Sequence, residues 1–188
     1  MKSLVTRLHN ATLVTIALLL VSGYSLAADP KQIMWENLIP PDWNPHKVFQ
    51  DMSDEEYNAL PEETYQRLLK QVQDELDNAP VIEALDGEQV RIPGFIVPLE
   101  TNNTAISEFL LVPYFGACTH TPPPPANQII YSKVREEYKM EDLYAPVWIT
   151  GTINTGRFTS QLNEAGVSQA ANINSAYSMQ VDVVEPYE

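Results

Sequence analysis

Hydrophobic residues along this chain change their spacing near residue 85, which divides the sequence into a helical front and a strand-rich back. In the front part, apolar residues recur at the spacing of one helix face, at Tyr65, Leu68, Leu69, Val72 and Leu76. Pro61 suits the first turn of such a helix, and Pro80 ends it. The pattern therefore predicts a helix over residues 61–78 whose apolar stripe packs into a core.

Two features precede this helix. Ser53 and Glu56 have the spacing of a capping box, in which each side chain bonds to the backbone N–H of the other, so a short helix is predicted to begin there. Residues 29–52 carry Trp35 and Trp43 among several prolines. Because tryptophan side chains are costly to leave in water, we interpret this stretch as an ordered arm laid over the domain and not as a floppy linker.

The back part of the chain predicts five strands, over residues 90–99, 106–114, 128–134, 147–153 and 177–184. The last strand is the clearest, because Tyr177, Met179 and Val181 alternate with polar residues. Gly94 and Gly151 lie inside the first and fourth strands, where a small barrel has to bend.

Between the third and fourth strands we expect a short helix over residues 135–143, and before the fifth strand a polar loop over residues 154–176. Five strands with a helix in that place follow the order of an OB-type barrel. The predicted fold is therefore α+β, with N-terminal helices packed on a small five-stranded, OB-like antiparallel β-barrel. We expect one compact unit, with an arm and helices over residues 28–84 and the OB-like β domain over residues 85–188.

The first 27 residues have the pattern of a signal peptide. Lys2 and Arg7 give a basic start, residues 11–21 are almost wholly apolar, and Ser25 and Ala27 are the small residues that a signal peptidase reads. The apolar run is too short to span a bilayer as a stable helix, which disfavours the alternative of an uncleaved anchor. The sequence thus predicts a protein that is periplasmic or secreted after cleavage near Ala27, and that meets the membrane only during export.

The charge balance and the cysteine count narrow the range of partners and chemistry. The sequence has 11 basic and 25 acidic residues, a formal net charge of −14. Such a chain repels phosphate backbones, so we expect no nucleic-acid partner, whereas cations are attracted. Cys118 is the single cysteine, which excludes an internal disulfide. In an oxidising compartment a lone thiol is usually buried, bound to a metal, paired with another chain or reactive.

Cys118 and His120 are the main candidates for chemistry. They stand two residues apart where a predicted core strand ends, so in extended backbone their side chains point to the same side. A thiolate and an imidazole can then bind one zinc ion, at about 2.3 Å and about 2.0 Å. Zinc normally takes three or four protein ligands, so Glu100, His46 or a second subunit has to complete the site, while Cu(I) accepts a Cys–His pair of low coordination.

The residues that follow are expected to support this pair. A stiff polyproline II segment is predicted over Pro122, Pro123, Pro124 and Pro125. Asn127 and Gln128 come next, and we expect their amides to hold the loop by hydrogen bonds or to form a second shell around His120.

Other interpretations of these residues stay open. One is that Cys118 is a buried structural residue and that His120 bonds to the backbone. Another is a thiol nucleophile whose pKa the imidazole lowers, although nothing in the sequence matches a hydrolase signature and no catalytic residue is assigned. A third is a barrel-like module that binds a protein or a ligand through its proline loop and tryptophan arm.

Two strings of the sequence, PGFIVPLE at 93–100 and EFLLVPYFGACTHTPPPPANQIIY at 108–131, resemble the signature of an uncharacterised family of exported bacterial proteins. The family is catalogued as a domain of unknown function, and the resemblance runs from Trp35 to the C-terminus. It brings no established reaction. It does imply an association with ABC-type export permeases and with periplasmic metal-binding proteins linked to zinc supply.

From the residues and the resemblance together we expect a periplasmic accessory protein that binds zinc or copper and works with an ABC-type membrane transport system. Its expected partner is the ABC-type transporter or a periplasmic metal-binding protein. An accessory role is favoured over an enzymatic one. The alternatives are a barrel-like protein- or ligand-binding module with a structural cysteine, and a thiol enzyme.

Overall fold

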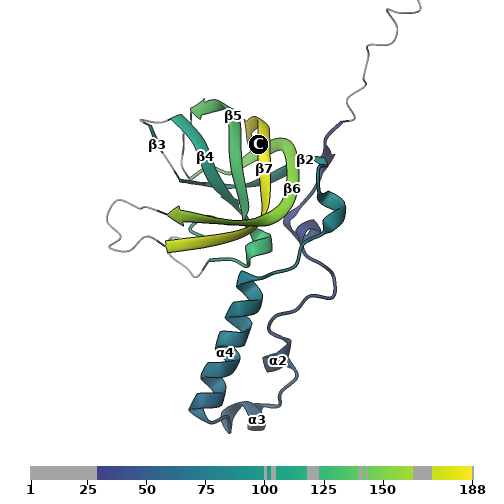
Figure 1. Cartoon of the computed structure of the whole chain (residues 1–188), viewed down its shortest axis with the longest axis vertical. Coiled ribbons are helices and arrows are strands. Elements are labelled where there is room, and N and C mark those ends of the chain that lie inside the picture. The colour runs from purple at the N-terminus through teal and green to yellow at the C-terminus, as the bar shows by residue number, and fades with distance from the viewer. Residues whose placement is uncertain are drawn as a thin grey trace, which may run out of the picture.

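The computed structural model describes residues 29–99, 101–102, 105–117, 123–139, 142, 144–162 and 171–187. Within them the helices are η2 (Trp35–Leu38), α2 (Lys47–Gln50), α3 (Asp54–Asn58), α4 (Glu62–Asp77), η3 (Glu83–Leu85) and η4 (Ala126–Gln128). The strands are β1 (Lys31–Gln32), β2 (Gln89–Pro98), β3 (Thr101–Asn102), β4 (Ala105–Val112), β5 (Ile130–Lys139), β6 (Val147–Leu162) and β7 (Ala171–Pro186). Figure 1 shows a β-barrel from which α2, α3 and α4 project, and we call these three helices the helical hairpin.

Among the described residues, five strands close into a ring. β2 pairs with β4 and β6, β5 pairs with β4 and β7, and β6 pairs with β7. Numbered along the chain from one to five, these strands follow the order 1-2-3-5-4 and return to 1, as in an OB-type barrel. The predicted α+β class and the five-stranded OB-like barrel are therefore confirmed. The barrel is mixed and not wholly antiparallel, because β5 and β7 run parallel.

One predicted helix is wrong. β5 continues to Lys139, so residues 135–139 are strand and not the start of a helix over 135–143. They lie beside β4, where Tyr138 is opposite Ile106. This backbone pairing outweighs the helical preference of the charged residues in the segment, because intrinsic propensity is a weak determinant once tertiary contacts form.

The predicted polar loop over residues 154–176 is also wrong in large part. β6 and β7 continue through much of it, paired with each other from Phe158 opposite Ser175 to Leu162 opposite Ala171. We call residues 158–162 and 171–175 the ribbon. An antiparallel pair with one solvated face can carry polar residues freely, which is why the sequence shows no clear strand pattern here.

The barrel interior is filled by apolar side chains that the strands contribute alternately. Tyr177, Met179 and Val181 of β7 are buried there, as their spacing predicts. Phe109 of β4 and Ile149 of β6 are fully buried in the same cluster. Side chains of the opposite parity on these strands face outward, so the barrel has an inner core and a separate outer face.

Gly94 and Gly151 mark places where neighbouring strands come too close for a side chain. A Cβ on Gly151 would overlap the carbonyl oxygen of Gln180 and lie 2.9 Å from the Cα of Val181. A Cβ on Gly94 would lie 2.8 Å from the carbonyl oxygen of Val112. The bending role predicted for both glycines thus corresponds to a close approach of backbones.

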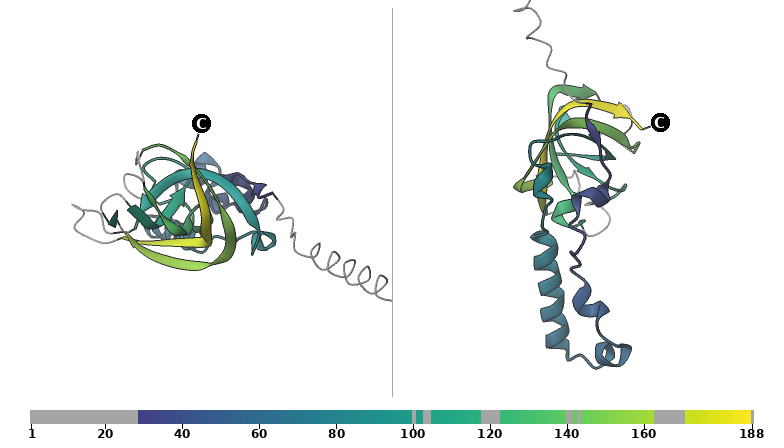
Figure 2. Two further views of the ribbon diagram at one scale, coloured as in Figure 1. Left: turned by 90° about the horizontal axis from the view of Figure 1, so that it is seen from above. Right: turned by 90° about the vertical axis from the view of Figure 1, so that its right-hand side faces the viewer.

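The helical hairpin points away from the barrel in Figure 1 and in the right-hand view of Figure 2. α4 covers the predicted helix, and Ser53 and Glu56 form the predicted capping box at the start of α3. The rings of Phe49, Tyr57 and Tyr65 join α2, α3 and α4, with centroids 6.1 Å apart. The helices therefore pack largely on one another and meet the barrel at one end. No helix in the part of the chain that the structure describes is long and apolar enough to cross a membrane.

The segments that lead into and out of the hairpin are ordered against the barrel. Trp35 is 8% exposed, and its Nε1 donates a hydrogen bond of 2.7 Å to the carbonyl oxygen of Pro93. The hydroxyl of Tyr177 donates to the carbonyl oxygen of Leu38 at 3.0 Å and accepts from the backbone N–H of Ile82 at 2.6 Å. Of the expected arm, Trp35 and Leu38 are buried against the barrel, and one tyrosine, Tyr177, bonds to the segments on both sides of the hairpin.

Candidate functional site

The Cys118–His120 segment lies between two described parts of the chain. Cys118, His120, Pro122 and Glu100 fall outside the described residues, as does the predicted signal peptide, so the roles assigned to them stay predictions. The structure shows the two flanks of the segment and the other predicted residues of the site.

The upstream flank leaves β4 through a tight turn. Gly116 has a φ of +80°, a conformation that residues with a Cβ rarely adopt. Ala117 is fully buried and packs in a cluster with Leu110, Val112 and Ile129 on the outer side of the barrel. The chain thus enters the Cys118–His120 segment from a fixed and buried position.

The downstream flank is bonded to the segments on either side of the hairpin. Pro123 is exposed, but Pro124 and Ala126 are buried. The Nδ2 of Asn127 donates to the carbonyl oxygen of Pro80 at 2.9 Å. The Nε2 of Gln128 donates to the carbonyl oxygen of Trp35 at 3.0 Å. Both amides therefore tie the end of the proline run to the N-terminal part of the chain.

Asn127 has one buried polar atom without a partner. The residue is fully buried, and its Oδ1 accepts no hydrogen bond from the described residues. Leaving a buried acceptor unsatisfied costs about 1–3 kcal/mol, so a donor is expected beside it. Asn127 follows His120 closely in the chain, and an imidazole N–H is a donor of the required kind.

Among the predicted ligands, His46 is the one that the described ranges include. It is exposed and precedes the first turn of α2, in the helical hairpin. Its backbone N–H donates to the Oδ1 of Asn44 at 3.1 Å. Over the described ranges, no group of three or more His, Cys, Asp or Glu side chains is placed to hold a metal ion. A site that uses His46 therefore needs ligands from the residues outside those ranges.

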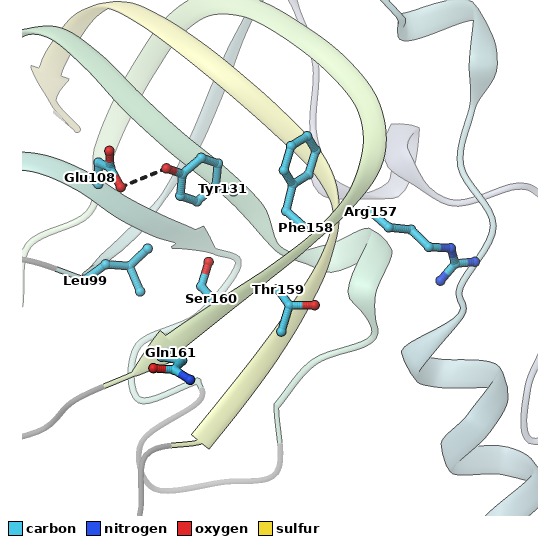
Figure 3. A pocket seen from close by; sticks show the side chains of 8 residues that line it. All are labelled: Leu99, Glu108, Tyr131, Arg157, Phe158, Thr159, Ser160 and Gln161. Carbon is cyan, nitrogen blue, oxygen red and sulfur yellow. Dashed lines mark hydrogen bonds between the residues drawn. The ribbon is translucent and has the colours of Figure 1, made fainter.

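A second candidate site, which the sequence does not predict, is an open groove on the outer face of the barrel (Figure 3). Its volume is about 590 Å³, within the usual range of ligand sites. The groove is lined by Leu99, Glu108, Tyr131, Arg157, Phe158, Thr159, Ser160 and Gln161. It lies between β4 and β5 on one side and the ribbon on the other. Arg157 points away from Tyr131 in Figure 3, and its guanidinium donates to the carbonyl oxygens of Asp77 and Asn78 at the end of α4.

Glu108 is the centre of a hydrogen-bonded network in this groove. Its Oε1 accepts from the Nζ of Lys133 at 2.7 Å, and its Oε2 accepts from the hydroxyl of Tyr131 at 2.8 Å. The hydrogen bond from Lys133, followed by that from Tyr131, lowers the pKa of Glu108 below its usual value. The carboxylate is thus ionised at neutral pH and is presented in a fixed orientation.

The groove also has an aromatic strip. The rings of Tyr131 and Phe158 are nearly parallel, with an interplanar angle of 16° and centroids 5.8 Å apart. Ser160 is buried, and Gln161 is exposed at the rim. From the sequence, Glu108 is one carboxylate among many and Phe158 lies in a predicted loop. Only the pairing of β6 with β7 brings them to one site.

Comparisons with known proteins identify a family without a known reaction. No curated protein matches the sequence. Among solved structures, the chain is similar to a DUF3299 family protein from Pseudomonas aeruginosa PAO1, with 36% sequence identity and a TM-score of 0.59. That match covers 86% of this chain and 98% of the other. A family model described as "Protein of unknown function (DUF3299)" matches residues 35–186. The expected resemblance to a domain of unknown function is confirmed, and the chain belongs to the DUF3299 family.

Proposed function

We propose that this chain is a periplasmic accessory protein that binds zinc or copper through Cys118 and His120. The observation that carries the proposal is the buried Oδ1 of Asn127, which has no donor among the described residues. A histidine that binds a metal through one ring nitrogen usually donates its other N–H to a carbonyl or carboxylate oxygen. Asn127 offers such an oxygen at the end of the loop that carries His120.

The contacts of the residues on either side of the loop support the same proposal. Ala117 is fully buried before the segment, and the Asn127 amide is bonded to Pro80 after it. A metal site gains affinity when its ligands are held in place by surrounding contacts. Contacts of this kind are present on both described flanks of the segment, which supports a ligand site between them.

The remaining ligand is a carboxylate or the second histidine. Glu100 comes two residues after the end of β2 at Pro98, and His46 is an exposed residue at the start of the hairpin. The net charge of −14 favours cation binding in general. A three-coordinate site of Cys118, His120 and Glu100 suits zinc, whereas a site of Cys118 and His120 alone suits Cu(I).

The proposal is tested by metal binding of the purified protein. Zinc(II) and Cu(I) are titrated in competition with a chromophoric chelator, for the wild type, Cys118→Ser and His120→Ala. We expect one equivalent in the wild type and a large loss of affinity in both variants. Asp182→Asn, which removes a carboxylate bonded to Gln89 and Arg135 on the barrel, serves as the control. A wild type that binds neither metal more tightly than micromolar contradicts the proposal.

We further propose that the protein works with an ABC-type transporter or with a periplasmic metal-binding protein. The support is the family association together with the predicted signal peptide. The test is growth of a deletion strain under zinc limitation and under copper stress. Complementation by the wild-type gene with failure of the Cys118→Ser gene is expected. Equal growth of all strains in both conditions would count against this part of the proposal.

The second candidate function, a ligand-binding barrel module, is favoured by the groove around Glu108. Of the two tryptophans of the arm, Trp43 is half-buried and lines a hollow beside α4, whereas Trp35 faces inward. Trp35 is buried and bonded to Pro93, so it contributes to stability and not to a binding surface. A binding module would therefore use the barrel face, and the two functions are compatible because the described parts of the two sites share no residue.

A further inference from the structure

The geometry points to the groove around Glu108 as a binding site for a neutral oligosaccharide. None of the described residues that line this groove belongs to the Cys118–His120 segment, and the inference does not depend on metal binding. Glu108 on β4 and Tyr131 on β5 have the opposite parity to the core residues Phe109 and Ile130. Both side chains therefore stand on the outer face of the barrel, where a ligand has access.

The position of the groove narrows the ligand class. Barrels of this type use the outer face of their second and third strands, with the loops after strands one and four, for oligonucleotides and oligosaccharides. Here β4 and β5 are the second and third strands, Leu99 follows the first, and the ribbon extends the fourth. A net charge of −14 disfavours a phosphate backbone. Of oligonucleotides and oligosaccharides, an uncharged oligosaccharide is therefore the better fit.

The local charges point the same way. Glu108 is paired with Lys133 at 2.7 Å, so the carboxylate that lines the groove is offset by an ammonium group. A charged ligand gains little from such a pair. A hydroxyl group gains more, because an ionised carboxylate has about four acceptor positions and the hydrogen bonds from Tyr131 and Lys133 occupy two of them.

The aromatic strip supplies the apolar part of the recognition. Tyr131 and Phe158 are both half-buried and nearly parallel, and Leu99 lines the same groove. The C–H face of a pyranose ring is apolar while its edges carry hydroxyl groups. A strip of rings beside a carboxylate matches this two-sided character, since aromatic surface favours contact with apolar groups.

The polar rim completes the match. Ser160 and Gln161 of β6 also line the groove (Figure 3). A hydroxyl and an amide each offer both a donor and an acceptor, as the hydroxyl groups of a sugar require. The groove is open and has a volume of about 590 Å³, so it accepts a few sugar units of a longer chain.

The test is an amide chemical-shift titration of the isotope-labelled protein with four probes: cellotetraose, chitotetraose, a short oligothymidylate and a lysine-rich peptide. We expect at least one of the two tetrasaccharides to bind saturably at millimolar or lower concentration, with shifts concentrated in β4, β5 and β6. Because the ligand is neutral, the affinity should not change between low and high salt. Glu108→Gln should lose about tenfold in affinity, the value of a hydrogen bond to a charged group.

Further variants keep the test decisive if Glu108→Gln unfolds. Gln161→Ala alters an exposed side chain of the rim and is expected to weaken binding while leaving the spectrum folded. Asp182→Asn removes a comparable paired carboxylate outside the groove and should bind like the wild type. The inference is overturned if neither tetrasaccharide binds, if shifts fall outside the groove, or if the oligothymidylate or the basic peptide binds there with a salt-dependent affinity. None of these results bears on the metal titration.

Discussion

The side-chain amide of Asn127 donates a hydrogen bond of 2.9 Å to the carbonyl oxygen of Pro80. This bond joins the end of the proline run to the segment that follows α4, two parts of the chain that are far apart in the sequence. The other side of the same amide, Oδ1, is buried without a donor among the described residues. One side chain thus ties the end of the proline run to the fold and carries a buried acceptor that no described residue satisfies.

Replacing Asn127 by alanine is expected to affect both stability and metal binding. The loss of the bond to Pro80 in a buried position should lower the free energy of unfolding by about 1–3 kcal/mol. If Oδ1 orients His120, metal affinity should also fall by about 10–100-fold. Urea unfolding and chelator competition measure the two effects, with the exposed Asn172→Ala as the control. Unchanged affinity for zinc and copper would separate Asn127 from the metal site.

Tyr177→Phe removes a buried hydroxyl that bonds to Leu38 and Ile82. We expect a loss of about 1–3 kcal/mol in the free energy of unfolding, because two backbone groups lose their partner. Burial raises the pKa of Tyr177 above its usual value. The contribution of the protonated Tyr177 hydroxyl to the free energy of unfolding is therefore present below pH ~10. It is lost as pH rises through the higher folded-state pKa. Unfolding curves at neutral and at alkaline pH should show this loss in the wild type and a smaller one in the variant.

Acid should weaken the outer face of the barrel. Hydrogen bonds from Lys133 and Tyr131 lower the pKa of Glu108, and hydrogen bonds from Gln89 and Arg135 lower the pKa of Asp182. The two ionised carboxylates therefore stabilise the folded state above their unfolded pKa values of about 4.3 and 3.9. This stabilisation is lost as pH falls through the folded-state pKa values.

Each of the two pairs should contribute less than about 1 kcal/mol, since both are partly exposed. Chemical unfolding at several pH values between neutral and acidic measures the slope of the free energy of unfolding against pH. The slope should be shallower in Glu108→Gln than in the wild type, and an identical slope would show that Glu108 is not held as described.

Gly151→Ala tests the closure of the barrel. The new Cβ would overlap the carbonyl oxygen of Gln180 and approach the Cα of Val181, both on backbone that cannot move independently. We expect a destabilisation of about 3 kcal/mol or more, or failure to fold. Gly87→Ala is the matched control, because its Cβ meets no atom within 4 Å although its φ of +78° adds some strain. Equal stability of the two variants would mean that β6 and β7 are less closely paired.

The barrel could be predicted because its core strands alternate. The alternating spacing of Tyr177, Met179 and Val181 predicts that their side chains are buried. A glycine inside a strand, Gly151, indicates a close approach of the neighbouring backbone. The ribbon could not be predicted in the same way. Its strands face water on one side, and Phe158 is an isolated aromatic residue in a polar stretch. Phe158 stacks on Tyr131 of β5. This contact depends on how distant strands pair, which the local sequence pattern does not predict.

The candidate sites differ in the same respect. The Cys118–His120 pair is visible in the sequence because a lone thiol and an imidazole stand two residues apart. The groove cannot be recognised in the sequence, because Glu108 becomes part of a site only through its hydrogen bonds with Lys133 and Tyr131 on the next strand. The position of the hairpin also depends on distant contacts, such as that of Arg157 with the end of α4.

The central claim is that Cys118 and His120 bind a metal, and X-ray absorption at the zinc or copper edge of the loaded protein tests it most directly. For zinc, the account predicts one sulfur scatterer at about 2.3 Å together with nitrogen or oxygen scatterers at about 2.0–2.1 Å. The sulfur shell should disappear in Cys118→Ser. A metal bound through nitrogen and oxygen alone, with a spectrum that is identical in the wild type and Cys118→Ser, would contradict the account.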